Sequence, residues 1–409
     1  LFEKDDHFGG HSYTLDLNVN NKKISADIGF IVFNYKTYPN LINFFKDNSI
    51  EIEKSNMSFS VSVKDTNFEY CGNGISGMFC NKSNIFNLKF LKMFFDVIKF
   101  YKKNENLKLA DNNLTLGEYL NKEKLSKEFI DYHIIPMVAA IWSMPPYEAS
   151  QMPLSFFLKF FQNHGLFKLK NRPQWYTVSN RSRTYVNKIL NKISGEYYKN
   201  YKINLIKRHK ENIEIFYGEK NEFFSYDKVV IATHADEALS ILENPTEDEK
   251  TLLSNFKYKS NLAVIHTDKN QMPRNKKAWS AWNAKLNKNV RENSSVTYWL
   301  NMLQNLNIDE DIFLTLNPFD KIDEKTIVEI EKEISENIKG SIKLKPKVDE
   351  SWITFRISYT EEVILFVIDC FVKINCEFRG YLWSGYKRTS YRGSSKHYDQ
   401  YQAAEFYEV

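Results

Sequence analysis

The first residues of the chain include types that can bind a nucleotide. Glu3 ends a short apolar, strand-like segment, and Gly9 and Gly10 stand side by side before His11. A carboxylate at the end of a strand can accept hydrogen bonds from both hydroxyls of a ribose. Two adjacent glycines let backbone N–H groups approach a pyrophosphate where a Cβ atom would obstruct them. The same residues are also typical of an ordinary Gly-Gly turn between strands.

A second candidate site lies later in the chain, where an apolar strand is followed directly by a helix. The run 228–233 is typical of a buried strand, and residues 234–242 have helical apolar spacing. The junction between a strand end and a helix N-terminus is where α/β folds bind ligands. Ala232, Thr233 and His234 occupy this junction, and a helix-capping role for Thr233 is the simpler alternative.

The elements that must position these residues fall into three blocks. Alternation over 13–19 and 57–63 predicts strands, dense aromatic residues at helical spacing predict a mostly helical segment over 84–165, and 202–224 predicts a three-stranded meander. Further predictions are a capping box at Thr115, helices at 246–256 and 324–338, and strands at 262–266, 312–316 and 363–368. Beta-rich pieces on both sides of a helical block favour an α/β fold whose nucleotide-binding lobe is interrupted by an inserted lobe.

Composition limits the classes of protein. The chain has 409 residues, 43% of them hydrophobic and 26% charged, which predicts either two domains or one large two-lobed domain, with a real core. A net charge of +5 is too small to indicate a nucleic-acid surface. The four cysteines include no C-x-x-C pair, so we expect no metal site and a reducing, cytoplasmic location. No apolar run approaches the ~20 residues of an integral membrane segment. The sequence shows no signal segment or initiator Met, and we interpret it as a fragment.

Several segments, in order along the chain, resemble the flavin-containing amine oxidase superfamily. The opening Leu1 to His11 resembles its second-strand signature, and further segments resemble one bacterial branch of FAD-dependent, amine-oxidase-like oxidoreductases. These segments are 26–34, 38–41, 57–62, 136–143, 161–166, 172–175, 230–236 and 297–301.

This resemblance implies a discontinuous FAD/NAD(P)-binding, Rossmann-like lobe and a substrate lobe of mixed helices and strands. The FAD-binding lobe would be 1–36 and 176–245, the substrate lobe 37–175 and 246–345, and 346–409 a divergent tail. Glu3 would bind the adenosine ribose, Gly9 and Gly10 the pyrophosphate, and His11 would replace an arginine common in the superfamily. Ala232 and Thr233 would lie against the adenosine half. Asp27 and Gly29 would form a turn towards the flavin, or a simple turn.

The resemblance also implies a substrate cavity over the flavin, walled by aromatic side chains, although core packing is the alternative for each of them. The candidates are Trp142, Trp175, Trp282, Tyr298 and Trp299. His164 precedes Gly165 at a predicted helix end, where capping is favoured over catalysis. No catalytic residue is assigned, because the flavin itself takes the electrons in hydride transfer.

Two functions remain open at this point. The first is FAD-dependent hydride transfer from an amine or an apolar, lipid-like small molecule. The alternative is a truncated, non-catalytic homologue that no longer binds FAD, because the family's first strand and its G-x-G-x-x-G loop, which belong before residue 1, are missing. In addition, 349–409 lacks the family's flavin-covering segment, and residues 380–409 show no period, so we expect a loosely held C-terminus.

Overall fold

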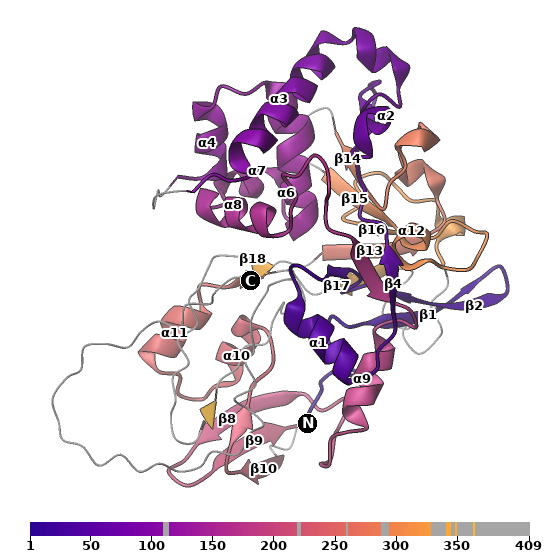
Figure 1. Ribbon diagram of the computed structural model, residues 1–409. Helices are drawn as coiled ribbons and strands as arrows, with labels where there is room; N and C mark the ends of the chain where they lie inside the picture. Colours follow the sequence, from indigo (N-terminus) through magenta and orange to yellow (C-terminus); the bar gives the residue numbers. More distant parts are fainter. Residues whose placement is uncertain are drawn as a thin grey trace.

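The computed structural model describes five stretches of the chain and the backbone of three short strands. The stretches are residues 1–108, 114–218, 222–258, 261–287 and 294–328, and the strands are 341–344, 348–349 and 363–364. Helices and sheets form a helical block, a central sheet and a strand-rich lobe beside the N-terminus (Figure 1). The fold class is α/β, as the sequence predicts.

A seven-stranded mixed sheet forms the middle of the molecule. In spatial order β17-β13-β16-β15-β14-β5-β6, its strands are Ser341–Leu344, Asn261–His266, Phe313–Leu316, Ser294–Trp299, Trp282–Leu286, Phe59–Val63 and Glu69–Cys71. All neighbouring strands are antiparallel except β14 and β5. Ser60 to Val63 are all buried, so β5 is covered on both faces rather than half-exposed. On the polar face Ser60 donates to Asn283 at 2.7 Å, and Asn283 in turn accepts from the Ser280 N–H.

The helical block packs against the apolar face of this sheet. Its helices are α2 (Gly74–Met78), α3 (Leu88–Asn104), α4 (Leu116–Lys122), α5 (Lys127–Phe129), α6 (Ile135–Trp142), α7 (Pro146–Gln151) and α8 (Leu154–Asn163), with a 3-10 turn at Lys82–Phe86 and a π turn at Ile130–Ile134. Thr115 and Glu118 form the predicted capping box of α4. The core of the block joins sheet residues Val61 and Leu286 to a dense aromatic cluster.

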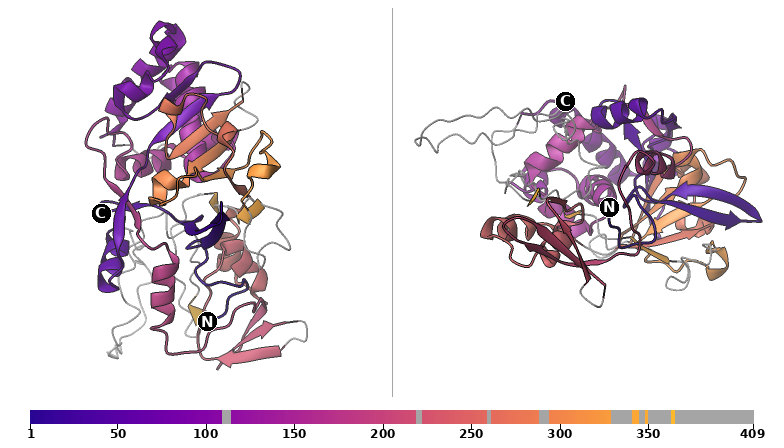
Figure 2. Two further views of the ribbon diagram at one scale, coloured as in Figure 1. Left: turned by 90° about the vertical axis from the view of Figure 1, so that its right-hand side faces the viewer. Right: turned by 90° about the horizontal axis from the view of Figure 1, so that it is seen from below.

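The strand-rich lobe lies at the opposite end of the molecule from the helical block (Figure 2). It contains the predicted meander β8 (Ile203–Arg208), β9 (Ile213–Tyr217) and β10 (Glu222–Tyr226), with α10 (Ala235–Ile241) and α11 (Glu247–Leu253). The opening segment joins this lobe, since the Glu3 N–H donates to the Tyr198 carbonyl at 2.9 Å. The strand predicted over 228–233 is only two residues long, β11 (Val229–Val230), and it pairs in parallel with β19 (Val363–Ile364). A further pair joins β12 (Lys257–Tyr258) to β18 (Val348–Asp349).

Smaller elements connect the two ends of the molecule. They are the hairpin β1 (Thr14–Val19) and β2 (Lys22–Asp27), the sheet β3 (Phe33–Asn34), β7 (Trp175–Val178) and β4 (Ile52–Ser55), and the helices α1 (Pro39–Asp47), α9 (Arg183–Leu190) and α12 (Leu300–Gln304). Because β3, β4 and β7 come from both sides of the boundaries proposed for the two lobes, one small sheet spans them. The lobe boundaries remain a prediction.

Some predictions fall largely outside the described residues. The helix predicted at 324–338 is absent from the described part of that segment: Glu324–Thr326 is a 3-10 turn, Ile327 is extended and forms a β-bridge with His266, and residues 329–338 lie outside the described residues. In the segment 363–368 only β19 is described, and 365–409 lies outside. Among the described residues, no helix is both long and apolar enough to cross a membrane.

Candidate functional site

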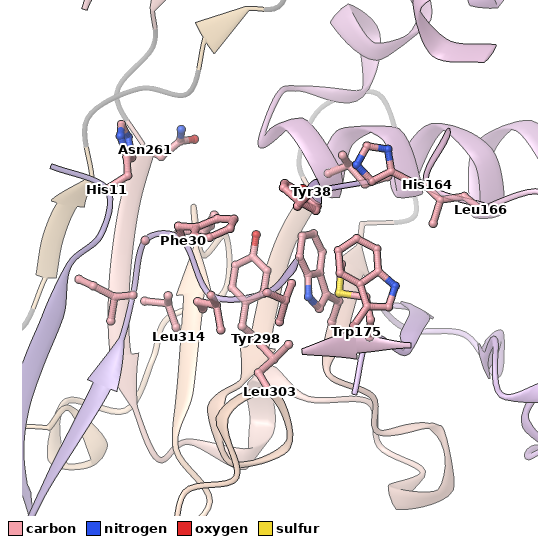
Figure 3. Close-up of a pocket in the computed structure, with 18 of the residues that line it drawn as sticks. His11, Phe30, Tyr38, His164, Leu166, Trp175, Asn261, Tyr298, Leu303 and Leu314 are labelled. Carbon is pink, nitrogen blue, oxygen red and sulfur yellow. The ribbon is translucent and has the colours of Figure 1, made fainter. Parts of the chain in front are cut away.

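A cavity lies between the central sheet, α8, β7 and the loop 28–32 (Figure 3). It encloses about 1250 Å³, counting the part that is open to solvent. Trp282 and Tyr298 from the sheet, Trp175 from β7, and Phe160 and His164 at the end of α8 form much of its wall. We call it the aromatic pocket.

The lining of the aromatic pocket is almost wholly apolar. Its polar side chains are His11, Tyr38, His164, Asn261 and Tyr298, and among the described residues that line it there is no carboxylate or ammonium group. Apolar side chains with a few placed hydrogen-bonding groups are typical of small-molecule sites. An apolar molecule with one or two polar atoms therefore suits this pocket.

Two strands of the sheet place a Tyr-Trp pair in the wall. Trp282 and Tyr298 are direct cross-strand partners in β14 and β15, and their rings meet edge to face with centroids 4.8 Å apart. Burial raises the pKa of Tyr298, so the phenol stays protonated at any physiological pH. The protonated hydroxyl can donate a hydrogen bond, and the Ser143 side chain is one of its hydrogen-bonding partners.

His164 forms the opposite part of the wall and is held in one tautomer. It is the C-cap of α8, as predicted, and its Nδ1 lies 2.9 Å from the Phe160 carbonyl oxygen. A carbonyl oxygen only accepts, so Nδ1 carries a proton, and in the neutral ring Nε2 is the acceptor atom. The ring stacks on Phe160 at 3.9 Å and runs nearly parallel to Trp175 at 6.2 Å. Capping thus explains the position of His164, but the residue also lines the pocket.

The opening segment reaches the pocket through His11. The Phe30 N–H donates to the His11 carbonyl at 2.8 Å, and a Cβ on Gly29 would lie 2.0 Å from the same oxygen. Only glycine at position 29 permits this approach. Gly9 and Gly10 have φ of +120° and +53°, and a Cβ on Gly10 would meet no atom within 4 Å. The backbone at Gly10 is thus open to an approaching ligand.

The end of β11 also comes close to the opening segment. His234 is buried, and its ring lies nearly parallel to those of His11 and Tyr258, at 5.7 and 4.5 Å. Thr233 does not cap α10: its hydroxyl donates to the His234 carbonyl at 3.2 Å, and the N-cap residue is His234, which makes no side-chain cap bond. The structure therefore brings the predicted residues Ala232 and Thr233 near His11 through the His234 ring.

Glu3 lies on the same side of the molecule. Its carboxylate is half-buried, accepts from the Asp5 N–H at 3.0 Å, and has a raised pKa chiefly because of burial. The next residue, Lys4, forms an ion pair with Glu237 on α10. We call Glu3, the Gly9 to His11 turn and residues 232–234 together the opening strip: the Lys4–Glu237 ion pair and the His11–His234 ring contact link the opening segment to α10 and its N-cap, and His11 lines the pocket.

Three of the five predicted cavity aromatics line the pocket, namely Trp175, Trp282 and Tyr298. Trp142 instead packs in the helical block against Phe156 and Phe160, with ring centroids 5.4 and 4.6 Å away. Trp299 lies on the other face of β15, where its ring meets Trp279 edge to face at 5.4 Å. For these two residues core packing, the alternative reading, is what the structure shows.

Asp27 is a structural residue. Its carboxylate, 1% exposed, accepts from the Ser182 N–H at 2.9 Å, the Ser182 hydroxyl at 2.8 Å and the Thr14 hydroxyl at 2.6 Å. These bonds satisfy the N-terminus of α9. Asp27 is thereby fully engaged in joining β1, β2 and α9.

Sequence reasoning missed part of the pocket and passed over one glycine motif. Phe30, Tyr38, Met57 and Phe160 line the cavity, and their only sequence signal is that they lie within or beside the segments of the family resemblance.

The glycine motif is at Gly72 to Gly77, which match G-x-G-x-x-G. These residues follow an edge strand paired only with its antiparallel neighbour, and α2 is five residues long. That context is not a dinucleotide-binding βαβ unit.

The described residues hold no group of three or more His, Cys, Asp or Glu side chains that could bind a metal ion. No protein-family model and no curated protein matches the sequence.

Solved structures match the fold. Cyclohexylamine oxidase from Brevibacterium oxydans IH-35A has a TM-score of 0.52 and 13% identity, covering 77% of this chain and 68% of that one. Putrescine oxidase with bound putrescine has a TM-score of 0.51 and 10% identity, covering 77% and 69%. A CLA-producing fatty acid isomerase from P. acnes has a TM-score of 0.50 and 13% identity, covering 79% and 72%. At such identities the likeness shows the fold alone, and this chain has the α/β fold of these enzymes.

Proposed function

We propose that the protein is a flavin-dependent oxidoreductase that takes a hydride from an apolar, lipid-like substrate. The observation that carries the proposal is the aromatic pocket, which lacks a charged group among its described lining residues and adjoins the opening strip at His11. The three named structural neighbours, two amine oxidases and a fatty acid isomerase, support this class of chemistry.

The residues of the opening strip and the pocket fit FAD. Gly10 leaves its backbone open on the side where a Cβ would project, as close approach of a pyrophosphate requires. Glu3 is the carboxylate that would accept from the ribose hydroxyls, and it is half-buried, with a pKa that burial raises. His11 leads from the strip into a pocket whose aromatic walls suit an isoalloxazine ring. Bound FAD would supply the hydride acceptor.

The chain's own residues orient the substrate and exclude water. Trp175, Trp282 and Phe160 supply apolar walls, Tyr298 supplies a donor, and His164 supplies an acceptor at Nε2. A protonated amine would enter this pocket without a carboxylate partner, and burying an unpaired charge is costly. An apolar substrate is therefore favoured over an amine, which would have to bind in its neutral form.

Titration of the purified chain with FAD tests the proposal. We expect visible flavin absorption that stays with the protein during gel filtration, followed by anaerobic loss of that absorption with an unsaturated or branched apolar substrate. Bleaching by amines alone would shift the substrate class to amines. Absence of any flavin binding would favour the alternative, a truncated homologue that no longer binds FAD.

Glu3→Ala provides a matched test of the opening strip. Loss of the acceptor for the ribose hydroxyls should weaken FAD binding by ~1–3 kcal/mol. Glu214→Ala, at another half-buried carboxylate in the same lobe, is the control. Isothermal titration would measure both, and equal affinities of the two variants would remove Glu3 from the site.

A further inference from the structure

The tip of the helical block exposes an unusual set of apolar side chains. Within 21 residues of sequence, five large apolar side chains are between 51% and 87% exposed: Ile75, Ile85, Phe86, Leu88 and Phe95. Single exposed apolar residues are ordinary, but a group of this size marks an interaction surface. We call it the α2–α3 patch.

The patch is one surface because α2 and α3 are packed together. Phe79, at the C-cap of α2, contacts Phe90 and Phe94 of α3 with ring centroids 5.6 and 5.3 Å away. Figure 1 shows α2 beside one end of α3, at the far end of the block from the N-terminus. The 3-10 turn that carries Ile85 and Phe86 leads directly into α3.

Helix α3 has apolar side chains on both of its faces. Its inner face carries Phe90, Met93 and Val97, which are buried. The outer face, at i, i+4, i+7 and i+11, carries Leu88, Lys92, Phe95 and Lys99, all exposed. A helix that only had to cover the core would have a polar outer face. Lysines interspersed with large apolar residues suit a lipid interface, because the apolar side chains can enter it while the long lysine side chains keep their ammonium groups at the headgroups.

The positive charge around the patch favours an anionic partner. Exposed lysines surround the apolar side chains, namely Lys82, Lys89, Lys92 and Lys99. The nearby acidic groups are largely engaged: Asp96 accepts from the Ser126 N–H and hydroxyl at 2.8 and 2.5 Å, and Glu128 lies 3.9 Å from the Lys89 ammonium. A second copy of the chain docked on this face would bring like charges together. Anionic lipid headgroups complement the lysines, while the apolar side chains enter the interface.

We propose that the α2–α3 patch docks the protein on the surface of an anionic lipid bilayer, with Phe86, Leu88 and Phe95 as apolar anchors. The docking is peripheral, through exposed side chains of α2, the 3-10 turn and α3. It depends on surface residues alone and does not depend on flavin binding.

Vesicle co-sedimentation of the full chain tests the proposal. Two vesicle compositions are compared, phosphatidylcholine alone and phosphatidylcholine with phosphatidylserine, and we expect stronger binding to the second that weakens as salt rises. The double variant Phe86→Ser with Leu88→Ser should lower binding at least about tenfold, because both anchors leave the interface. Lys89→Glu with Lys92→Glu should remove the preference for phosphatidylserine.

The matched control is Phe223→Ser with Lys228→Glu, at exposed positions of the strand-rich lobe, and it should bind like the unchanged chain. Because all substituted side chains are exposed, circular dichroism should be the same for every variant. No binding to either vesicle, or equal binding by the anchor and control variants, would overturn the proposal. So would a dimer, seen by sedimentation velocity, that dissociates in the Phe86/Leu88 variant.

Discussion

The helical block and the strand-rich lobe bury apolar surface in different ways. The block packs large rings completely, with Phe90, Phe129, Phe157 and Phe161 at 0% exposure. In the lobe every fully buried core member is aliphatic, and rings such as Phe223 and Tyr226 stay exposed on the outside of the meander. The block therefore has the deep core, whereas the lobe that carries the opening strip has a thin one. A region with a thin core is the one expected to open locally and to gain most from a bound ligand.

The largest expected effect is in the core of the block. Phe161→Ala should lower the free energy of unfolding by about 3–5 kcal/mol, because it empties a site enclosed by Phe157 and Phe167 at 4.3 and 5.2 Å. Phe223→Ala in the lobe, at a ring that is 52% exposed, should cost less than about 1 kcal/mol. Urea unfolding of both variants measures the difference, and similar losses would contradict the contrast between the two cores.

The next largest loss of stability is expected at Asp27, which joins β1, β2 and α9. Asp27→Ala should cost about 3 kcal/mol, because the Ser182 N–H and the Ser182 and Thr14 hydroxyls would stay buried without their acceptor. Asp16→Ala, on the same hairpin but more exposed, is the control. An equal, small loss in both variants would show that the Asp27 bonds add little.

Many secondary-structure elements could be predicted from local sequence signals, whereas the residues that line the pocket could be predicted only in part. Periods of two and 3.6 identified β1, the meander, the helical character of residues 84–165 and the helices α10 and α11, and the Thr115 to Glu118 pattern identified the capping box, since those signals are local. The second strand of the hairpin, β2, was not predicted.

The pocket joins a loop, a helix end and two sheets, so which residues line it depends on packing. Trp142 ends helix α6 and Trp175 begins strand β7, and the tertiary packing of those two elements decides that only Trp175 faces the pocket. The sequence did allow one correct exclusion. Tyr298 and Trp299 are consecutive residues of a strand, so their side chains point to opposite faces of the sheet and cannot both line one cavity.

Acid should destabilise the block and the central sheet through two buried histidines. Burial lowers the pKa of His133 to about 3 and, despite the opposing effect of Asp268, that of His266 to about 4. The unfolded chain therefore takes up protons first, and stability falls as pH drops below about 6.5 towards these values. At pH 5 each histidine should cost about 2 kcal/mol.

The pH slope of the unfolding free energy isolates this effect. His133 is held between the Tyr70 and Tyr101 hydroxyls at 2.8 and 2.9 Å. In His133→Leu the slope between pH 6.5 and 5 should fall by about one proton, whatever the absolute stability of the variant. An unaltered slope in His133→Leu would mean that this imidazole is protonated in the folded chain.

The smallest loss of stability is expected at the capping box, a motif that occurs in both regions. Thr115 and Glu118 cap α4 in the block, and Thr246 and Glu249 cap α11 in the lobe, each with both reciprocal bonds. Thr→Ala should cost about 1 kcal/mol at either site, because each change removes one side-chain acceptor from a helix N-terminus.

The acidic partners of the two caps should behave differently. Glu118 is solvent-accessible, whereas Glu249 is 8% exposed and also accepts two bonds from Arg208, at 2.8 and 3.1 Å. A bidentate guanidinium pair shielded from water is stronger than an exposed one. Glu249→Gln should therefore cost about 1–2 kcal/mol more than Glu118→Gln, since the Arg208 charge would lose its partner. Thermal unfolding of the two variants decides the point: equal melting temperatures would mean that water compensates Arg208, and that the thin core leaves this ion pair effectively exposed.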